Sequence, residues 1–154
     1  MAQKPRKPNA RRKAKPQSPR PARRPKTDAN PIRGLGIDVM EVDRIEQMLV
    51  DHPTKFLSRV FTAGEAAHST GRRNRAQHLA ARFAAKEAAM KALGTGLTSG
   101  VTWHDFEVVT DASGKPALSV TGKAASIART LRIRAWSVSL THTRLHAAAV
   151  VIAT

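Results

Sequence analysis

The sequence predicts an α+β domain, in which a small antiparallel sheet packs with one long helix and several short helices. Two patterns support this fold class. Apolar side chains recur at helical spacing in the alanine-rich stretch 79–93, and Gly94 stands where helices commonly end. Elsewhere the apolar runs have the length of strands, and two of them flank the turn sequence 111–114 as the arms of an antiparallel hairpin would.

The N-terminal half of this domain is expected to begin with a strand and two helices. A strand near 34–40 leads into a helix over about 41–51, which carries an apolar stripe and is ended by Pro53. Thr62 and Glu65 have the spacing of a capping box, which predicts the start of a short helix.

The C-terminal half is expected to be mostly strands. The basic run 72–75 is expected to form a loop before the long helix. The remaining elements are a strand over 103–109, its hairpin partner over 117–120, a helix over 122–131, and two strands over 135–141 and 145–153.

Charge and proline content separate the N-terminus from the rest of the chain. Residues 1–30 hold eleven Lys and Arg against one acid, and seven of the nine prolines lie at or before Pro31. Such a segment has too few apolar side chains to offset the entropy of ordering it. We therefore expect a disordered basic tail over 1–31 and one folded domain over 32–154. The tail can be a solubilising extension or an electrostatic arm for an acidic protein, an RNA or a membrane surface.

Composition excludes several classes of protein. The chain has no cysteine, so it can form neither disulfides nor thiolate metal sites. No run approaches the roughly 18 apolar residues of a membrane span, and we expect a cytoplasmic protein. A nucleic-acid-binding module would explain a sequence pI of about 11.6, but the aromatic content of 4% and the lack of a recognition motif disfavour it.

Two acidic residues interrupt the apolar patterns. Glu87 lies beside the apolar stripe of the long helix, with Lys91 one turn later, and Asp38 lies within the first strand. Glu87 and Lys91 can be an ordinary solvated pair, which stabilises a helix by only about 0.2–0.5 kcal/mol. Alternatively, Asp38 and Glu87 are two hard oxygen ligands of the kind Mg²⁺ uses when substrate phosphates fill its other positions.

Five segments, in order along the chain, resemble the holo-acyl-carrier-protein synthase family of small 4′-phosphopantetheinyl transferases. They are 36–45, 56–65, 82–96, 111–116 and 139–143, and the run Phe-Ala-Ala-Lys-Glu-Ala within the third is the most specific. The resemblance implies the fold of that family. It also implies transfer of 4′-phosphopantetheine from coenzyme A to a serine of an apo-acyl carrier protein in fatty acid biosynthesis, with release of adenosine 3′,5′-bisphosphate.

The resemblance also implies roles for particular residues. Asp38 and Glu87 match the ligands of a catalytic Mg²⁺ ion, and Lys91 matches a lysine that contacts the pyrophosphate and stabilises the leaving group. The residues expected to bind coenzyme A are Arg82, His142, Gly114, Lys115 and Pro116, with His142 and Arg82 at its phosphates. The group that deprotonates the serine is left open among a metal-held water, Asp38 and another carboxylate.

Three further expectations concern Lys86 and the partners. Lys86 lies near the middle of the apolar stripe, where it can either snorkel past the stripe or reach a phosphate. Arg44 matches an arginine that docks the acidic recognition helix of the carrier protein. By family analogy, we expect a homotrimer with active sites between subunits. The competing interpretation within the family, an inactive relative that only binds carrier proteins, is disfavoured by the joint presence of Asp38, Glu87 and Lys91.

Overall fold

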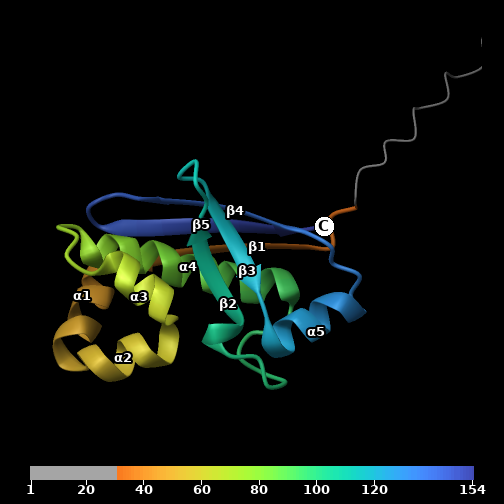
Figure 1. The fold of residues 1–154 in the computed structure, drawn as a ribbon, viewed down its shortest axis with the longest axis horizontal. Helices are drawn as coiled ribbons and strands as arrows, with labels where there is room; N and C mark the ends of the chain where they lie inside the picture. Colours follow the sequence, from red (N-terminus) through yellow and green to blue (C-terminus); the bar gives the residue numbers. More distant parts are fainter. Residues whose placement is uncertain (1–30) are drawn as a thin grey trace, which may run out of the picture.

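The structure is a computed structural model that describes residues 31–154, and it has the α+β architecture predicted from the sequence (Figure 1). The predicted basic tail therefore lies outside the described residues, except for Pro31. The elements are β1 (Gly34–Glu41), α1 (Val42–Asp51), α2 (Pro53–Val60), α3 (Ala63–Ser69), α4 (Arg75–Leu93), η1 (Trp103–Asp105), β2 (Phe106–Thr110), β3 (Pro116–Val120), α5 (Gly122–Thr130), β4 (Trp136–His142) and β5 (His146–Ala153).

The main sheet has three antiparallel strands in the order β1-β5-β4. Figure 1 shows this sheet lying along one side of the long helix α4, whose contacts are mostly with β1 and β5. Strand side chains alternate between the two faces of a sheet. On β1, Asp38 and Met40 lie on the face toward α4, whereas Leu35, Ile37 and Val39 on the opposite face are 63%, 64% and 59% exposed.

Helix α4 forms the centre of the core and is buried on nearly all sides. Its many alanines let neighbouring backbones approach closely, and the glycines of β1 extend this approach. A Cβ atom added to Gly36 would overlap the carbonyl oxygen of Ala88 and lie 2.8 Å from the backbone nitrogen of Ala92. Gly94 ends the helix with a left-handed φ of 80°, as predicted, and donates its N–H to the carbonyl oxygens of Met90 and Lys91. Small residues on both elements thus bring β1 directly onto α4.

The helices before α4 confirm one prediction and correct another. The capping box of α3 is complete, because the Thr62 hydroxyl accepts from the Glu65 N–H and the Glu65 carboxylate accepts from the Thr62 N–H. Pro53 follows the end of α1, but it also occupies the first turn of α2, a helix that the sequence analysis did not expect. Proline at a first helical position loses no hydrogen bond, so it can begin a helix as readily as it ends one.

The predicted hairpin is present but starts later than expected. Residues Trp103–Asp105 form a single 3₁₀ turn, so β2 begins at Phe106 and pairs with β3. The turn is held by the Asp111 carboxylate, which accepts from the N–H groups of Ser113 and Lys115. Within the described residues, no helix is long and apolar enough to cross a membrane.

Candidate active site

Asp38, Glu87 and Lys91 come together where β1 lies against α4. The Nζ atom of Lys91 donates to Oδ1 of Asp38 at 2.8 Å and to the carbonyl oxygen of Ile37 at 3.1 Å. Within the described residues, the ion pair of Lys91 is therefore made across the two elements with Asp38, and not along the helix with Glu87. The structure brings the three predicted catalytic residues into one half-buried cluster.

The positive charges of Lys91 and Arg44 do not fully offset the burial and the mutual repulsion of the two carboxylates in this cluster. Burial raises the pKa of Glu87 above its usual value and the negative charge of Asp38 raises it further, while Lys91 and Arg44 act in the opposite direction. The second carboxylate oxygen of Asp38, Oδ2, is buried and has no hydrogen-bond partner. An unpaired buried oxygen of a charged group is costly, and a bound cation would remove that cost.

These residues fit Mg²⁺ as part of a site completed by substrate. Residues 31–154 contain no cluster of three or more His, Cys, Asp or Glu side chains that could hold a metal by themselves. Mg²⁺ commonly binds through one or two carboxylates and takes its other ligands from water and substrate phosphates. Asp38 with its unpaired oxygen and the neighbouring Glu87 meet that requirement.

A cavity of about 530 Å³ lies between α3, α4, the β2–β3 hairpin and β4. Its walls contain Arg82, His142, Gly114 and Pro116, four of the residues that the sequence predicted for the coenzyme. Arg82 is 5% exposed, and its Nε atom has no hydrogen-bond partner. A buried guanidinium with a free donor favours an anionic ligand.

Lys86 has a different environment from the one predicted. It is 0% exposed, and its Nζ atom pairs with Oε2 of Glu65 at 2.6 Å. It also donates to the carbonyl oxygens of Val60 at 2.7 Å and Trp103 at 3.1 Å. These contacts use all three N–H donors of the ammonium group, so the structure contradicts the prediction that Lys86 snorkels to solvent or contacts a coenzyme phosphate.

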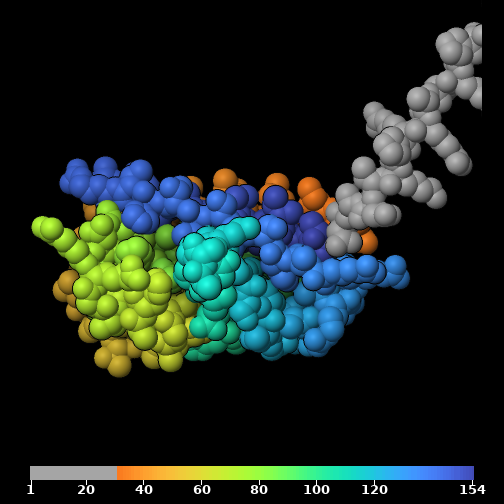
Figure 2. All heavy atoms as spheres, turned by 45° about the horizontal axis from the view of Figure 1, so that its top comes forward, coloured from red at the N-terminus to blue at the C-terminus, as the bar shows by residue number. Residues whose placement is uncertain are grey.

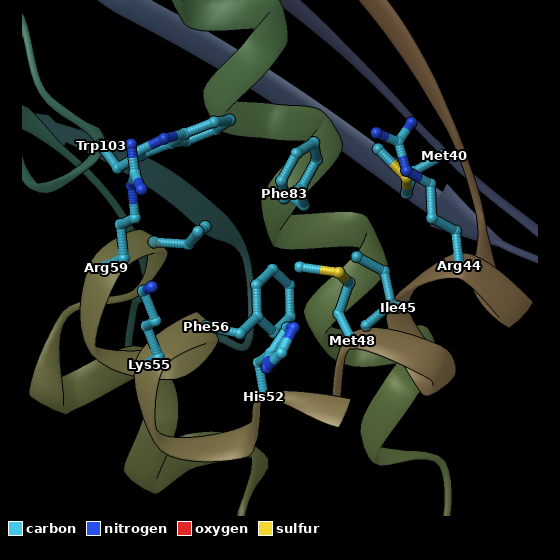
Figure 3. Close-up of a pocket in the computed structure, with 11 residues that line it drawn as sticks. Met40, Arg44, Ile45, Met48, His52, Lys55, Phe56, Arg59, Phe83 and Trp103 are labelled. Atoms are coloured by element: carbon cyan, nitrogen blue, oxygen red, sulfur yellow. The ribbon is translucent and has the colours of Figure 1, made fainter. Parts of the chain in front are cut away.

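A second cavity, of about 340 Å³, opens between α1, α2 and α4 (Figure 3). Its floor is apolar, with Met48, Phe56 and Phe83 pointing inward, while basic side chains from α1 and α2 stand around it. Arg44, predicted to dock the carrier protein, is one of these basic residues and also lies near enough to Glu87 to lower its pKa. This groove, which we call the basic groove, therefore adjoins the carboxylate cluster.

The comparisons with known proteins agree with this geometry. A model of the 4′-phosphopantetheinyl transferase superfamily matches residues 34–151. The chain belongs to this superfamily. A holo-[acyl-carrier-protein] synthase of Koribacter versatilis is 47% identical to it over 121 residues, which cover 79% of this chain and 97% of that protein.

Solved structures of other superfamily members have the same fold. The crystal structure of holo-[acyl-carrier-protein] synthase from Neisseria meningitidis matches with a TM-score of 0.72 at 31% identity, over 80% of this chain and 98% of that one. The enzyme from Bacillus anthracis, in complex with CoA (3′,5′-ADP), matches with a TM-score of 0.66 at 35% identity, over 79% of this chain and 96% of that one. The resemblance found in the sequence and the predicted fold class are both confirmed.

The structure of this superfamily member also reveals residues that the sequence analysis missed. Lys55 and Arg59 line the basic groove from α2, the unexpected helix. The sequence signal for this helix was the i,i+4 apolar pair Phe56 and Val60, which begins three residues after Pro53. In the other cavity, His68 and His78 lie beside Arg82. Nothing in the spacing of these two histidines pointed to a site, because they come from different helices.

Lys115 was also predicted to bind the coenzyme, but it does not line the cavity. It is exposed at the tip of the hairpin, between Gly114 and Pro116, and its backbone N–H donates to Asp111. Gly114 has a φ of 85°, a conformation that favours glycine, so this residue shapes the turn beside the cavity. Contact between Lys115 and the coenzyme stays a prediction.

Proposed function

We propose that the chain is a holo-[acyl-carrier-protein] synthase, which transfers 4′-phosphopantetheine from coenzyme A to a serine of an apo-acyl carrier protein. The observation that carries this proposal is the position of the cluster Asp38, Glu87 and Lys91. Helix α4 joins this cluster to two other features. One is the cavity around Arg82 and His142, here called the cationic cavity, which suits a phosphorylated nucleotide, and the other is the basic groove, which suits an acidic protein. The proposal therefore places both substrates around one reaction centre.

The coenzyme is assigned to the cavity that contains Arg82 and His142. A guanidinium presents two donors in one plane and binds phosphate more specifically than an ammonium does. Arg82 lies five residues before Glu87 on α4, which corresponds to roughly 7.5 Å along the helix axis. Five residues also turn a helix by roughly 500°, so the two side chains leave α4 in directions about 140° apart, and the cavity and the carboxylate cluster are separate subsites for phosphates at two places of the ligand. Gly114 and Pro116 line this cavity, and we propose that they and Lys115 between them lie near the nucleotide.

Asp38 and Glu87 would hold the Mg²⁺ ion on which we propose that the reaction depends. When bound, Mg²⁺ neutralises charge on the phosphates as the bond to the leaving group breaks. Lys91 contributes a second positive charge from the opposite side of Asp38. In phosphoryl transfer the protein acts mainly by positioning and charge stabilisation, so this small set of groups is sufficient.

The basic groove is assigned to the carrier protein. Arg44, Lys55 and Arg59 lie around apolar side chains of the groove, and none of its lining residues is acidic. Such a surface fits an amphipathic helix with acidic and apolar side chains. Phe83 at its floor precedes Glu87 by one helical turn, so a helix held here presents a neighbouring serine to the carboxylate cluster.

The exposed apolar face of β1 is assigned to self-association. Leu35, Ile37 and Val39 form an apolar row on an edge strand, and no element of residues 31–154 covers it. Exposed apolar rows of this kind mark protein interfaces. A homotrimer with active sites between subunits, a cytoplasmic location and a role in fatty acid biosynthesis follow from the family resemblance and complete the proposal.

Intact-protein mass spectrometry tests the proposal directly. The chain is incubated with coenzyme A, Mg²⁺ and an apo-acyl carrier protein, and the carrier should gain roughly 340 Da, the mass of the transferred arm. Glu87→Gln and added EDTA should each abolish the gain. Glu41→Gln, which changes an exposed glutamate on the same strand as Asp38, should retain it.

Three other outcomes would count against the proposal. The absence of a mass gain with several carrier proteins would refute the transferase function and favour a relative that only binds carrier proteins. Activity that survives EDTA would refute the metal role of Asp38 and Glu87. Loss of the mass gain when residues 1–30 are removed would show that residues 31–154 are not sufficient for the transfer.

A further inference from the structure

The cationic cavity contains basic side chains in addition to those predicted to bind the phosphates of the coenzyme. Besides Arg82 and His142, its walls contain His68 from α3, Arg72 from the loop that follows, and His78 from α4. None of its lining residues is acidic. Figure 2 shows the cyan β2–β3 hairpin at the surface, beside the yellow-green residues of α3 and the following loop and below the blue strands.

His78 is held in a defined position by its neighbours. Its imidazole packs edge-on against the ring of His142, with ring centroids 5.5 Å apart and planes at 74°. Its backbone carbonyl accepts a hydrogen bond from Nη1 of Arg82 at 3.3 Å. Within residues 31–154, neither ring nitrogen of His78 or His142 takes part in a hydrogen bond, so both rings have donors and acceptors free for a ligand.

The surroundings lower the pKa values of two histidines of the cavity, His78 and His68. Burial lowers the pKa of His78, and Arg72, His142, Arg82 and His68 lower it further. Burial also lowers the pKa of His68, together with the charges of Arg82 and Arg72. All the charged and titratable groups that act on these two histidines are basic.

Two acids, Glu65 and Glu107, lie on the side of the cavity where Arg82 is. Buried Glu65 attracts Arg82, and Glu107 from β2 lies with His68 and Arg82 in an adjoining hollow. Glu107 accepts a hydrogen bond from the Thr62 hydroxyl at 2.7 Å, so one of its oxygens is already occupied. A dianionic ligand would therefore be the strongest negative charge that His78 meets.

We propose that His78 and His142 together recognise the phosphomonoester of the coenzyme, and that His78 takes up a proton from solvent as this group binds. This inference rests on the proposed function. It adds a role for His78 and the uptake of a proton to the proposed binding of the coenzyme. A phosphomonoester carries about −1.5 to −2 charges at pH 7. An opposite charge within about 4–6 Å favours the protonated imidazole.

The separation of the cavity from the carboxylate cluster selects the phosphomonoester over the pyrophosphate, since none of Asp38, Glu87 and Lys91 lines the cavity. The pyrophosphate is assigned to Asp38, Glu87 and Lys91, and Arg82 lies five residues away from Glu87 on the helix. The remaining phosphate of coenzyme A is the monoester on the ribose. The bound state holds more protons than the free state, so the affinity for coenzyme A should rise as the pH falls from about 8 to 6, while the affinity for 3′-dephospho-coenzyme A should not.

Calorimetry tests this inference with coenzyme A and 3′-dephospho-coenzyme A as the two probes. Titrations at pH 7.5 in buffers of different ionisation enthalpy report the protons taken up on binding. The wild-type chain should take up a substantial fraction of one proton with coenzyme A and almost none with the dephospho form. His78→Phe keeps an aromatic ring against His142 but cannot be protonated. It should lose that uptake and bind coenzyme A about tenfold more weakly, as expected for one charge-assisted hydrogen bond.

The controls separate this inference from the proposed function. His78→Gln is a second variant in case phenylalanine disturbs folding, which thermal unfolding would reveal. His104→Gln changes an exposed histidine outside the cavity and should behave as wild type. Equal proton uptake with both probes, or a His78→Phe variant with unchanged uptake and affinity, would overturn the role of His78. If the wild-type chain transfers the arm in either case, the proposed function survives.

Discussion

The buried ion pair between Lys86 and Glu65 allows a stability prediction of definite size. Lys86 is 0% exposed and Glu65 is 1% exposed, and they join α4 to α3. Glu65 also accepts hydrogen bonds from the backbone N–H groups of Thr62 and Val108, at 3.0 Å each. The substitution Lys86→Met would leave the buried Glu65 carboxylate with these two neutral donors and with the nearby charge of Arg82, but without its ion-pair partner.

Removing one partner of a buried pair typically costs about 3–5 kcal/mol of unfolding free energy, because the other charge is left uncompensated. For a domain of this size, a loss of about 3 kcal/mol lowers Tm by on the order of 10 °C. Glu65→Gln should destabilise the protein for the same reason, since it leaves the Lys86 ammonium unpaired. The double variant removes both charges, so its loss should be clearly smaller than the sum of the two single losses.

Urea unfolding at a fixed protein concentration, followed by the fluorescence of Trp103 and Trp136, measures these free energies. Lys123→Met, which changes an exposed lysine on α5, is the matched control and should stay within about 0.5 kcal/mol of wild type. If the two single losses simply add in the double variant, within about 0.5 kcal/mol, the pair does not act as a unit and the reasoning is refuted.

Three further predictions concern the active site. Gly36→Ala forces β1 away from the Ala88 carbonyl, so we expect the unfolding free energy measured in urea to fall by about 1–3 kcal/mol and the transfer reaction to slow. Unchanged stability would contradict the close packing of β1 on α4. Because folding raises the pKa of Glu87, ionisation of Glu87 destabilises the folded state above that pKa. In EDTA at pH 7–8, the Tm of Glu87→Gln should therefore be no lower than that of wild type. Any gain in Tm should disappear at acidic pH, where wild-type Glu87 is protonated. Arg44→Glu should raise KM for the carrier protein about tenfold at low salt with little change in kcat, and an effect independent of salt would argue against electrostatic docking.

The parts of the fold with local signals were predicted well from the sequence. The capping residues Thr62 and Glu65 and the terminating Gly94 fix helix ends by hydrogen bonds to nearby backbone groups, so neighbouring residues suffice to predict them. Helix α2 was missed because Pro53 ends one helix and begins the next, and its local preference does not distinguish the two. The strand expected from Trp103 begins as a 3₁₀ turn, an irregularity that periodicity does not detect.

The candidate site was predicted unevenly for a similar reason. Asp38 and Glu87 were recognisable because each is an acid in an apolar pattern, and the family resemblance then gave them a role. Lys86 was misjudged because its partner, Glu65, lies on another helix. His78 carried no signal, because its significance comes from His142 on a distant strand.

By itself, the sequence determined the fold class and the superfamily and singled out Asp38 and Glu87 as candidate metal ligands, because periodicity, caps and ordered motifs are properties of neighbouring residues. The tertiary structure decided which charges meet. It paired Lys91 with Asp38 and Lys86 with Glu65, and it collected histidines from three elements around Arg82. Electrostatic interactions depend on distance through space and on burial, and both are fixed only when the strands and helices pack.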